Sequence, residues 1–142
     1  SKVVFHSTSN EEDIHSMFSA LVEGGYIDSS TEFTTFRGIF DETMFEHPIV
    51  WMKTQALLMY FVHLAFKPHN PYDVWVKCAN CFRLRGGKTP NRQSMDSNFR
   101  FIVKKGLLAT YDIRLKTIAD NYHSNKNKNA DITSSMKESI ST

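Results

Sequence analysis

The segment from Pro48 to Phe66 constrains the fold most strongly, because it is apolar on more than one side. Proline is favoured at the first position of a helix, so we expect a helix to begin at Pro48 and to run to about residue 66. Its apolar residues follow helical spacing: Trp51, Leu57, Leu58, Phe61, Leu64 and Ala65. A helix with several apolar sides must be covered by other elements. We therefore expect this helix at the centre of the domain.

An amphipathic helix is predicted over residues 10–23. Ser9 and Glu12 have the spacing of a capping box, and Gly24 and Gly25 supply a stop. The apolar residues between them recur on one helical face: Ile14, Met17, Phe18, Leu21 and Val22.

Two shorter elements flank this first helix. Residues 2–5 fit either a short strand or an extended arm. After the helix, Ser30 or Thr31 can cap a short helix. That short helix would place three aromatic residues in the core: Phe33, Phe36 and Phe40.

Prolines and glycines divide the second half of the chain. Pro68 and Pro71 end the central helix, and Asn70 can cap the helix that follows. We expect this fourth helix to end before Gly86. Its inner face would hold Val74, Trp75, Cys78 and Phe82.

A fifth helix is expected after a loop at residues 86–93, with Ser94 as its cap. Two lysines in the last turn and Gly106 just beyond them form a typical helix end. Its inner face would hold Met95, Phe99, Ile102 and Val103. Residues 107–122 fit a helix better than a strand, although their alternation fits both.

The chain has 142 residues, of which 41% are hydrophobic, enough for one domain with a core. We expect a mainly α, compact helical domain over residues 1–122. Residues 123–142 have little apolar material to offset the entropy of ordering, so we expect a disordered polar tail. The chain begins with Ser1 rather than Met, which fits either a fragment with a further domain upstream or a processed chain.

No apolar run reaches the roughly 20 residues needed to span a bilayer, and the first residues lack a secretory signal. We therefore expect a cytoplasmic protein without a membrane partner. Cys78 and Cys81 have C-x-x-C spacing within the fourth helix, which favours buried structural cysteines over zinc binding or redox chemistry. No catalytic pattern is found, and the sequence GGKT lacks the first glycine of a phosphate-binding loop. We expect neither an enzyme nor a cofactor.

The charges are divided between the two parts of the chain. The first fifty residues carry nine carboxylates and only two cations, Lys2 and Arg37. From Val76 to Lys105 there are eight cations against the single acid Asp96. A basic surface with interspersed polar residues is what a polyanion such as nucleic acid selects, because phosphate neutralisation supplies most of the affinity.

This charge pattern predicts that the fourth and fifth helices form a helix-turn-helix-like pair that binds double-stranded DNA. Near the start of the fifth helix, base edges would be reached by Gln93, Ser94, Ser97, Asn98 and Arg100. Phosphates would be contacted by Arg83, Arg85, Lys88, Lys104 and Lys105, and Lys77 and Arg92 complete the predicted surface. The loop between the helices is about twice as long as the three or four residues of a helix-turn-helix.

The main alternative is a helical protein–protein interaction module. In that case the acidic N-terminal face and the basic face would dock complementary partners, or each other in a head-to-tail homo-oligomer.

A set of aromatic residues and glycines also resembles a known family. They are Gly25-Tyr26-Ile27, then Phe36 and Phe40, then Pro48-Ile49-Val50-Trp51 with Leu58, Tyr60 and Phe61, then Trp75 and Phe82. Over about residues 10–105 their order resembles the C-terminal region of RteC-like regulators of conjugative transposons and related mobile-element proteins. The resemblance implies a winged-helix DNA-binding domain that regulates transcription of excision and transfer genes. It implies no individual DNA contact, and a wing would have to come from residues 106–118.

Overall fold

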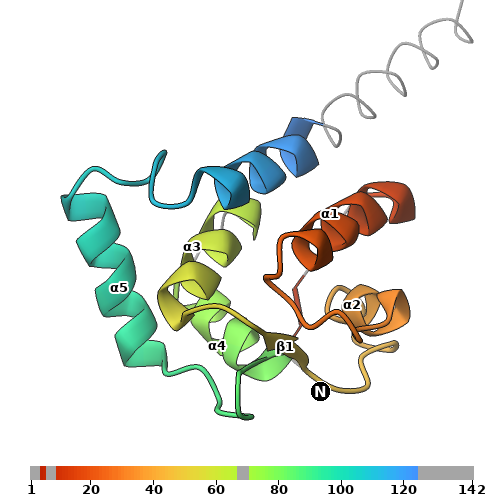
Figure 1. Ribbon diagram of the computed structural model, residues 1–142. Helices are drawn as coiled ribbons and strands as arrows, with labels where there is room; N and C mark the ends of the chain where they lie inside the picture. Colours follow the sequence, from red (N-terminus) through yellow and green to blue (C-terminus); the bar gives the residue numbers. More distant parts are fainter. Residues whose placement is uncertain (1–3, 6–8, 67–70, 125–142) are drawn as a thin grey trace, which may run out of the picture.

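The computed structural model describes residues 4–5, 9–66 and 71–124, and these are mainly helical (Figure 1). A further helix covers residues 113–124 and is called the C-terminal helix below. The expected mainly α, compact fold is confirmed. The other elements are α1 (Glu11–Glu23), α2 (Phe33–Gly38), β1 (Ile49–Trp51), α3 (Gln55–Phe66), α4 (Pro71–Cys81), β2 (Phe82–Leu84) and α5 (Arg92–Lys104).

Helix α3 lies at the centre of the fold (Figure 1). The five consecutive residues from Leu58 to Val62 are each 0% exposed. Because successive residues turn by about 100° around a helix, this run is buried on every side. Tyr60 donates its hydroxyl to the carbonyl of Leu108 at 2.7 Å, and the Phe61 ring stacks on Trp51 at 5.9 Å. The prediction of a central helix ending at about residue 66 is confirmed.

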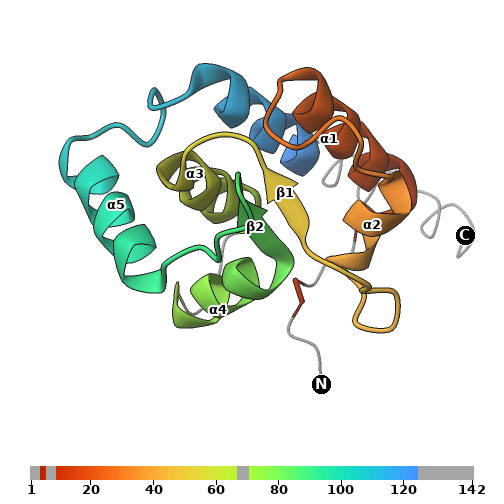
Figure 2. The ribbon, with the colours of Figure 1, turned by 60° about the horizontal axis from the view of Figure 1, so that its bottom comes forward.

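The expected start of that helix at Pro48 is wrong, because Ile49–Trp51 forms strand β1. This strand pairs in parallel with β2, with Ile49 opposite Phe82 (Figure 2). On its other edge, Trp51 forms an antiparallel bridge with Ile27. A short apolar run fits a buried strand as well as a helix, and pairing with distant residues decides between them.

Helix α3 begins four residues later than β1 ends, at Gln55. Thr54 supplies its cap, because the Thr54 hydroxyl accepts the N–H of Leu57 at 3.2 Å. The indole of Trp51 donates to the carbonyl of Thr54 at 2.9 Å. The Trp51 side chain is thus fully buried with its polar atom satisfied.

The residues at the N-termini of the first two helices differ from the predicted caps. Asn10, not Ser9, caps α1, because its side chain accepts the N–H of Asp13 at 2.9 Å. Ser9 donates instead to the hydroxyl of Tyr122 at 2.8 Å. Glu32, not Ser30 or Thr31, stands at the start of α2 and makes no side-chain cap bond.

The remaining N-terminal predictions hold except for two of the three phenylalanines of the second helix. Helix α1 covers nearly the predicted range and stops at the glycine pair, where Gly25 has a φ of 74° that favours glycine. Phe36 and Phe40 are buried, but Phe40 lies beyond the end of α2. Phe33 is only half-buried and packs against the edge of the core. Phe5 belongs to an extended arm and not to a strand. It is buried, and its N–H donates to the carbonyl of Ile39 at 2.8 Å.

Helix α4 ends at Cys81, so Phe82 is buried from strand β2 and not from the helix as predicted. Both cysteines are free thiols with 0% exposure. Burial raises the pKa of Cys81 to about 12 and raises the pKa of Cys78 as well, so both stay protonated at neutral pH.

The proposed cap of α4, Asn70, lies outside the described residues. Among the residues that are described, no three or more histidine, cysteine or acidic side chains gather as metal ligands.

After α5 the chain forms turns and then the C-terminal helix, which confirms the helical expectation for part of residues 107–122. The described chain has no strand between residues 106 and 118, so no wing forms there. His123 belongs to the helix, and its Nε2 donates to the carbonyl of Leu64 at 2.8 Å. The predicted tail boundary at residue 123 is therefore too early, and residues 125–142 lie outside the described part. No helix in that described part is long and apolar enough to cross a bilayer.

A hydrogen bond ties the turn after α1 to the C-terminal helix. The Tyr26 hydroxyl donates to both carboxylate oxygens of Asp112, at 2.9 and 3.0 Å. The same carboxylate accepts the N–H of Leu115 at 3.0 Å and so caps the C-terminal helix. Burial and this hydrogen bond raise the pKa of Tyr26 to about 12 from its usual value of 10.0.

This raised pKa predicts an alkaline loss of stability. The folded state holds the Tyr26 proton more tightly than the unfolded chain, so the contribution of Tyr26 is complete below pH 10 and is lost as the pH rises to about 12. In Tyr26→Phe, the free energy of unfolding should fall less steeply between those pH values in urea titrations. Tyr111→Phe, which keeps the Tyr26–Asp112 bond, is the control and should follow the native curve. Equal slopes for both variants would contradict the assignment.

Candidate nucleic-acid interface

Helix α5 is held against the core by one face only. Met95 and Ile102 are buried, and the Phe99 ring packs 3.9 Å from the ring of His63 on α3. Burial lowers the pKa of His63, which keeps this contact neutral at physiological pH. Val103, predicted on the inner face, is 44% exposed because it is turned by about 100° from Ile102.

The start of α5 is fixed to the start of α3. Asn91 caps α5 by accepting the N–H of Ser94 at 2.9 Å, so Ser94 is not the cap that the sequence predicted. The N–H of Asn91 donates to the side chain of Gln55 at 2.7 Å. The first turn of α5 therefore has a defined position on the central helix.

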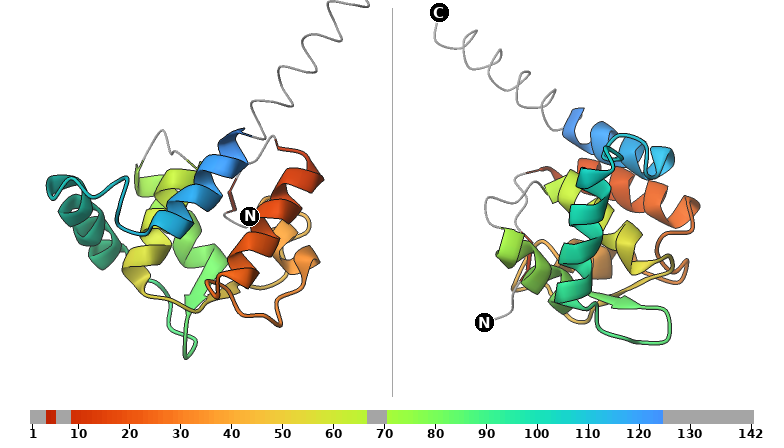
Figure 3. Two further views of the ribbon diagram at one scale, coloured as in Figure 1. Left: turned by 45° about the horizontal axis from the view of Figure 1, so that its top comes forward. Right: turned by 90° about the vertical axis from the view of Figure 1, so that its left-hand side faces the viewer.

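The face of α5 opposite the core is polar and basic. Gln93, Ser97, Arg100 and Lys104 are all exposed and follow the spacing i, i+4, i+7 and i+11, which places them on one side of the helix. We call these four residues the outer face of α5. Figure 3 (right) shows α5 along the outside of the fold, so this face is not covered by another helix of the described chain.

Arg100 on this face forms an ion pair with Asp96 at 3.0 Å, one helical turn earlier. The Arg100 side chain is 80% exposed, so the pair is a surface pair worth less than about 1 kcal/mol. A phosphate or a guanine could replace the carboxylate at little cost. Arg100 is thus positioned by its own helix and remains accessible to a partner.

A tight turn precedes α5 and carries two further cations. The N–H of Leu84 donates to the carbonyl of Lys88 at 2.8 Å, and the N–H of Gly87 donates to the carbonyl of Leu84 at 2.9 Å. Gly86 and Gly87 both have a φ of 85°, which a side chain would disfavour. The turn at residues 84–88 thus exposes Arg85 and Lys88 ahead of α5.

Not all predicted binding residues lie in this surface. Arg83 is half-buried, and its guanidinium donates to the carbonyls of Ala79 and Phe82 at 2.6 and 2.7 Å. Arg83 therefore closes the end of α4 and is not presented to solvent like Arg85. Lys77 and Asn98 are also half-buried, on the flanks of α4 and α5. The other predicted residues are exposed: Arg85, Lys88, Arg92, Gln93, Ser94, Ser97, Arg100, Lys104 and Lys105.

The charge division of the sequence is also a division in space. Helices α1 and α2 lie on the side of the molecule opposite α5 (Figures 1 and 2). The first turn of α1 carries Glu11, Glu12 and Asp13, and Glu11 pairs with Arg37 of α2 at 3.6 Å. The basic residues of α5 and of the 84–88 turn therefore face away from the acidic side of the fold.

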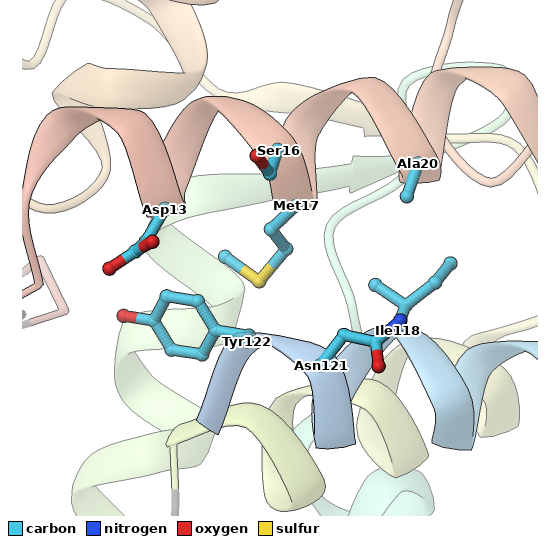
Figure 4. Close-up of a pocket in the computed structure, with 7 residues that line it drawn as sticks. All are labelled: Asp13, Ser16, Met17, Ala20, Ile118, Asn121 and Tyr122. Atoms are coloured by element: carbon cyan, nitrogen blue, oxygen red, sulfur yellow. The ribbon is translucent and has the colours of Figure 1, made fainter. Parts of the chain in front are cut away.

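A separate pocket of about 290 Å³ lies between α1 and the C-terminal helix (Figure 4). The carboxylate of Asp13 lies near the ring of Tyr122 at one end, and the sulfur of Met17 lies between the two helices. None of the predicted binding residues lines this pocket: its lining consists of Asp13, Ser16, Met17, Ala20, Ile118, Asn121 and Tyr122. It is therefore distinct from the basic surface.

Sequence reasoning missed one residue of the basic surface. Phe101 is 55% exposed and follows Arg100 directly on α5. The signal was available, because Phe101 is out of register with the inner stripe of Met95, Phe99 and Ile102.

No protein-family model matches this chain, and comparisons with curated proteins and with solved structures also gave no match.

The position of Arg83 predicts that it stabilises the fold. Arg83→Ala removes the guanidinium that donates to the carbonyls of Ala79 in α4 and Phe82 in β2, and it should lower the free energy of unfolding by about 1–2 kcal/mol in urea denaturation. Arg85→Ala, two residues away and exposed, should change it by less than about 0.5 kcal/mol. If Arg83→Ala were as stable as Arg85→Ala, the assignment of Arg83 to the fold would be wrong.

Proposed function

We propose that this chain is a double-stranded DNA-binding domain that docks through α5 and the turn at residues 84–88. The observation that carries the proposal is the outer face of α5: a full-length helical face of hydrogen-bonding and cationic residues, on the side away from the acidic helix α1. An α-helix fits the major groove of B-form DNA, which is about 12 Å wide.

In this proposal α5 supplies the contacts to base edges. Arg100 pairs with the O6 and N7 atoms of guanine, Gln93 pairs with adenine, and Ser97 donates to or accepts from either. Asn98, which we also expected to read bases, contributes less because it is half-buried beside the core. The base contacts are therefore spread along the whole outer face of α5 and are not confined to its start, as the sequence predicted.

The remaining exposed cations hold the domain on the DNA backbone. Arg85 and Lys88 approach phosphates ahead of α5, and Lys104 and Lys105 do so at its end. The basic turn at residues 84–88 takes the part that a wing plays in winged-helix domains, although it precedes the recognition helix. Residues 82–91 separate α4 from α5, so the pair is helix-turn-helix-like with a long connection.

The resemblance to RteC-like regulators gives the proposal its biological setting. We propose that the domain belongs to a cytoplasmic regulator of excision and transfer genes on a mobile element. The segregated charges also suit a head-to-tail protein interaction, and this second function predicts salt-sensitive self-association without DNA.

The test is a charge reversal in the turn. Arg85→Glu with Lys88→Glu should weaken binding to all duplexes alike, because it removes two phosphate contacts. The slope of log K against log salt should become shallower by about 2, as measured by fluorescence anisotropy across a salt series.

The control is Lys53→Glu with Arg114→Glu, which changes the net charge by the same amount at two exposed cations outside the proposed surface. This variant should keep nearly the native slope. Equal losses in both double variants would show that net charge alone attracts DNA, and native affinity after the reversal at residues 85 and 88 would contradict the proposed surface.

A further inference from the structure

Phe101 is the exposed aromatic residue within the polar surface of α5. Its side chain is 55% exposed, and it contributes nothing to the inner stripe that packs on α3 and α4. Single exposed apolar residues are common on protein surfaces, so exposure alone has no functional meaning. The placement of Phe101 among the proposed base-contacting residues is what distinguishes it.

Ser97, Arg100, Phe101 and Lys104 follow the spacing i, i+3, i+4 and i+7. Residues at this spacing form one compact patch on a helix. The recognition helix of homeodomains presents its base-contacting residues at the same spacing. Any partner that covers Arg100 and Lys104 therefore also covers the Phe101 ring.

The charges around the ring favour DNA over an apolar protein surface as this partner. Arg100 and Lys104 lie beside Phe101 on the helix, and Lys105 Nζ lies 5.9 Å from the centre of its ring. An apolar protein partner would have to desolvate these cations, whereas the DNA groove supplies phosphates for them.

We propose that Phe101 reads thymine, through contact of its ring with the C5-methyl group in the major groove. That methyl group is the apolar feature that distinguishes thymine there, and phenylalanine is among the side chains that contact it. The inference rests on the proposed function and adds a base preference to it. A preferred site should contain a thymine beside the base read by Arg100.

The test removes the methyl group and nothing else. The 142-residue chain first selects duplexes from a random pool, and each thymine of a selected site is then replaced singly by deoxyuracil. One replacement should weaken binding about fourfold, the equivalent of burying one methyl group. In Phe101→Ala the loss of affinity on replacing that thymine should disappear, whereas Phe101→Leu should keep part of this loss. Val103→Ala, a matched change at an exposed residue on another side of α5, should keep all of it.

The other outcomes distinguish a failure of this inference from a failure of the proposed function. The inference is wrong if the native chain binds DNA but no deoxyuracil replacement weakens the binding. It is also wrong if a replacement weakens binding equally in the native chain and in Phe101→Ala. Both outcomes leave the proposed function intact. Absence of binding to any duplex at low salt overturns both the inference and the proposed function. Self-association of the native chain that is lost in Phe101→Ala, without a methyl effect, would assign Phe101 to an interface between copies.

Discussion

The burial of α3 on every side determines the rest of the structure. A helix whose residues from Leu58 to Val62 are all shielded cannot lie at a surface, so it requires cover from several directions. That cover comes from helices α4 and α5, from Trp51 of strand β1, and from the C-terminal segment through Leu108 and His123. A helix that covers α3 then needs only one apolar face, and its opposite face is exposed to solvent.

The candidate interface follows from this division. Helix α5 uses Met95, Phe99 and Ile102 for the core, and the side that remains is polar and basic. The first turn of α5 is held on α3 through Asn91 and Gln55, so the outer face has a fixed orientation. A helix with a fixed backbone loses less conformational entropy on binding than a basic loop would. The acidic helix α1 lies on the opposite side, where its carboxylates do not repel a polyanion.

Much of the fold could be predicted because periodicity is a local signal. It identified α1, the end of α3 and three of the four residues predicted on the inner face of α5, Val103 being the exception. The glycine at residue 106 marked the end of α5. Periodicity failed at Ile49–Trp51 and at Phe82, where two strands pair across thirty residues of sequence and no local pattern reveals the partner. The basic segment was identified by composition, but composition treats all cations alike. Only the geometry shows that Arg83 bonds the carbonyls of Ala79 and Phe82 while Arg85 faces solvent.

We propose that duplex DNA contacts the outer face of α5. The most direct measurement is a titration of the isotope-labelled chain with duplex DNA at low salt, followed by amide chemical shifts in NMR spectra. We expect the largest shifts along the segment from Gln93 to Lys105 and in the turn at residues 84–88, with little change in α1 and α2. Shifts concentrated in α1 or around the pocket beside Tyr122, with α5 unchanged, would contradict the proposal.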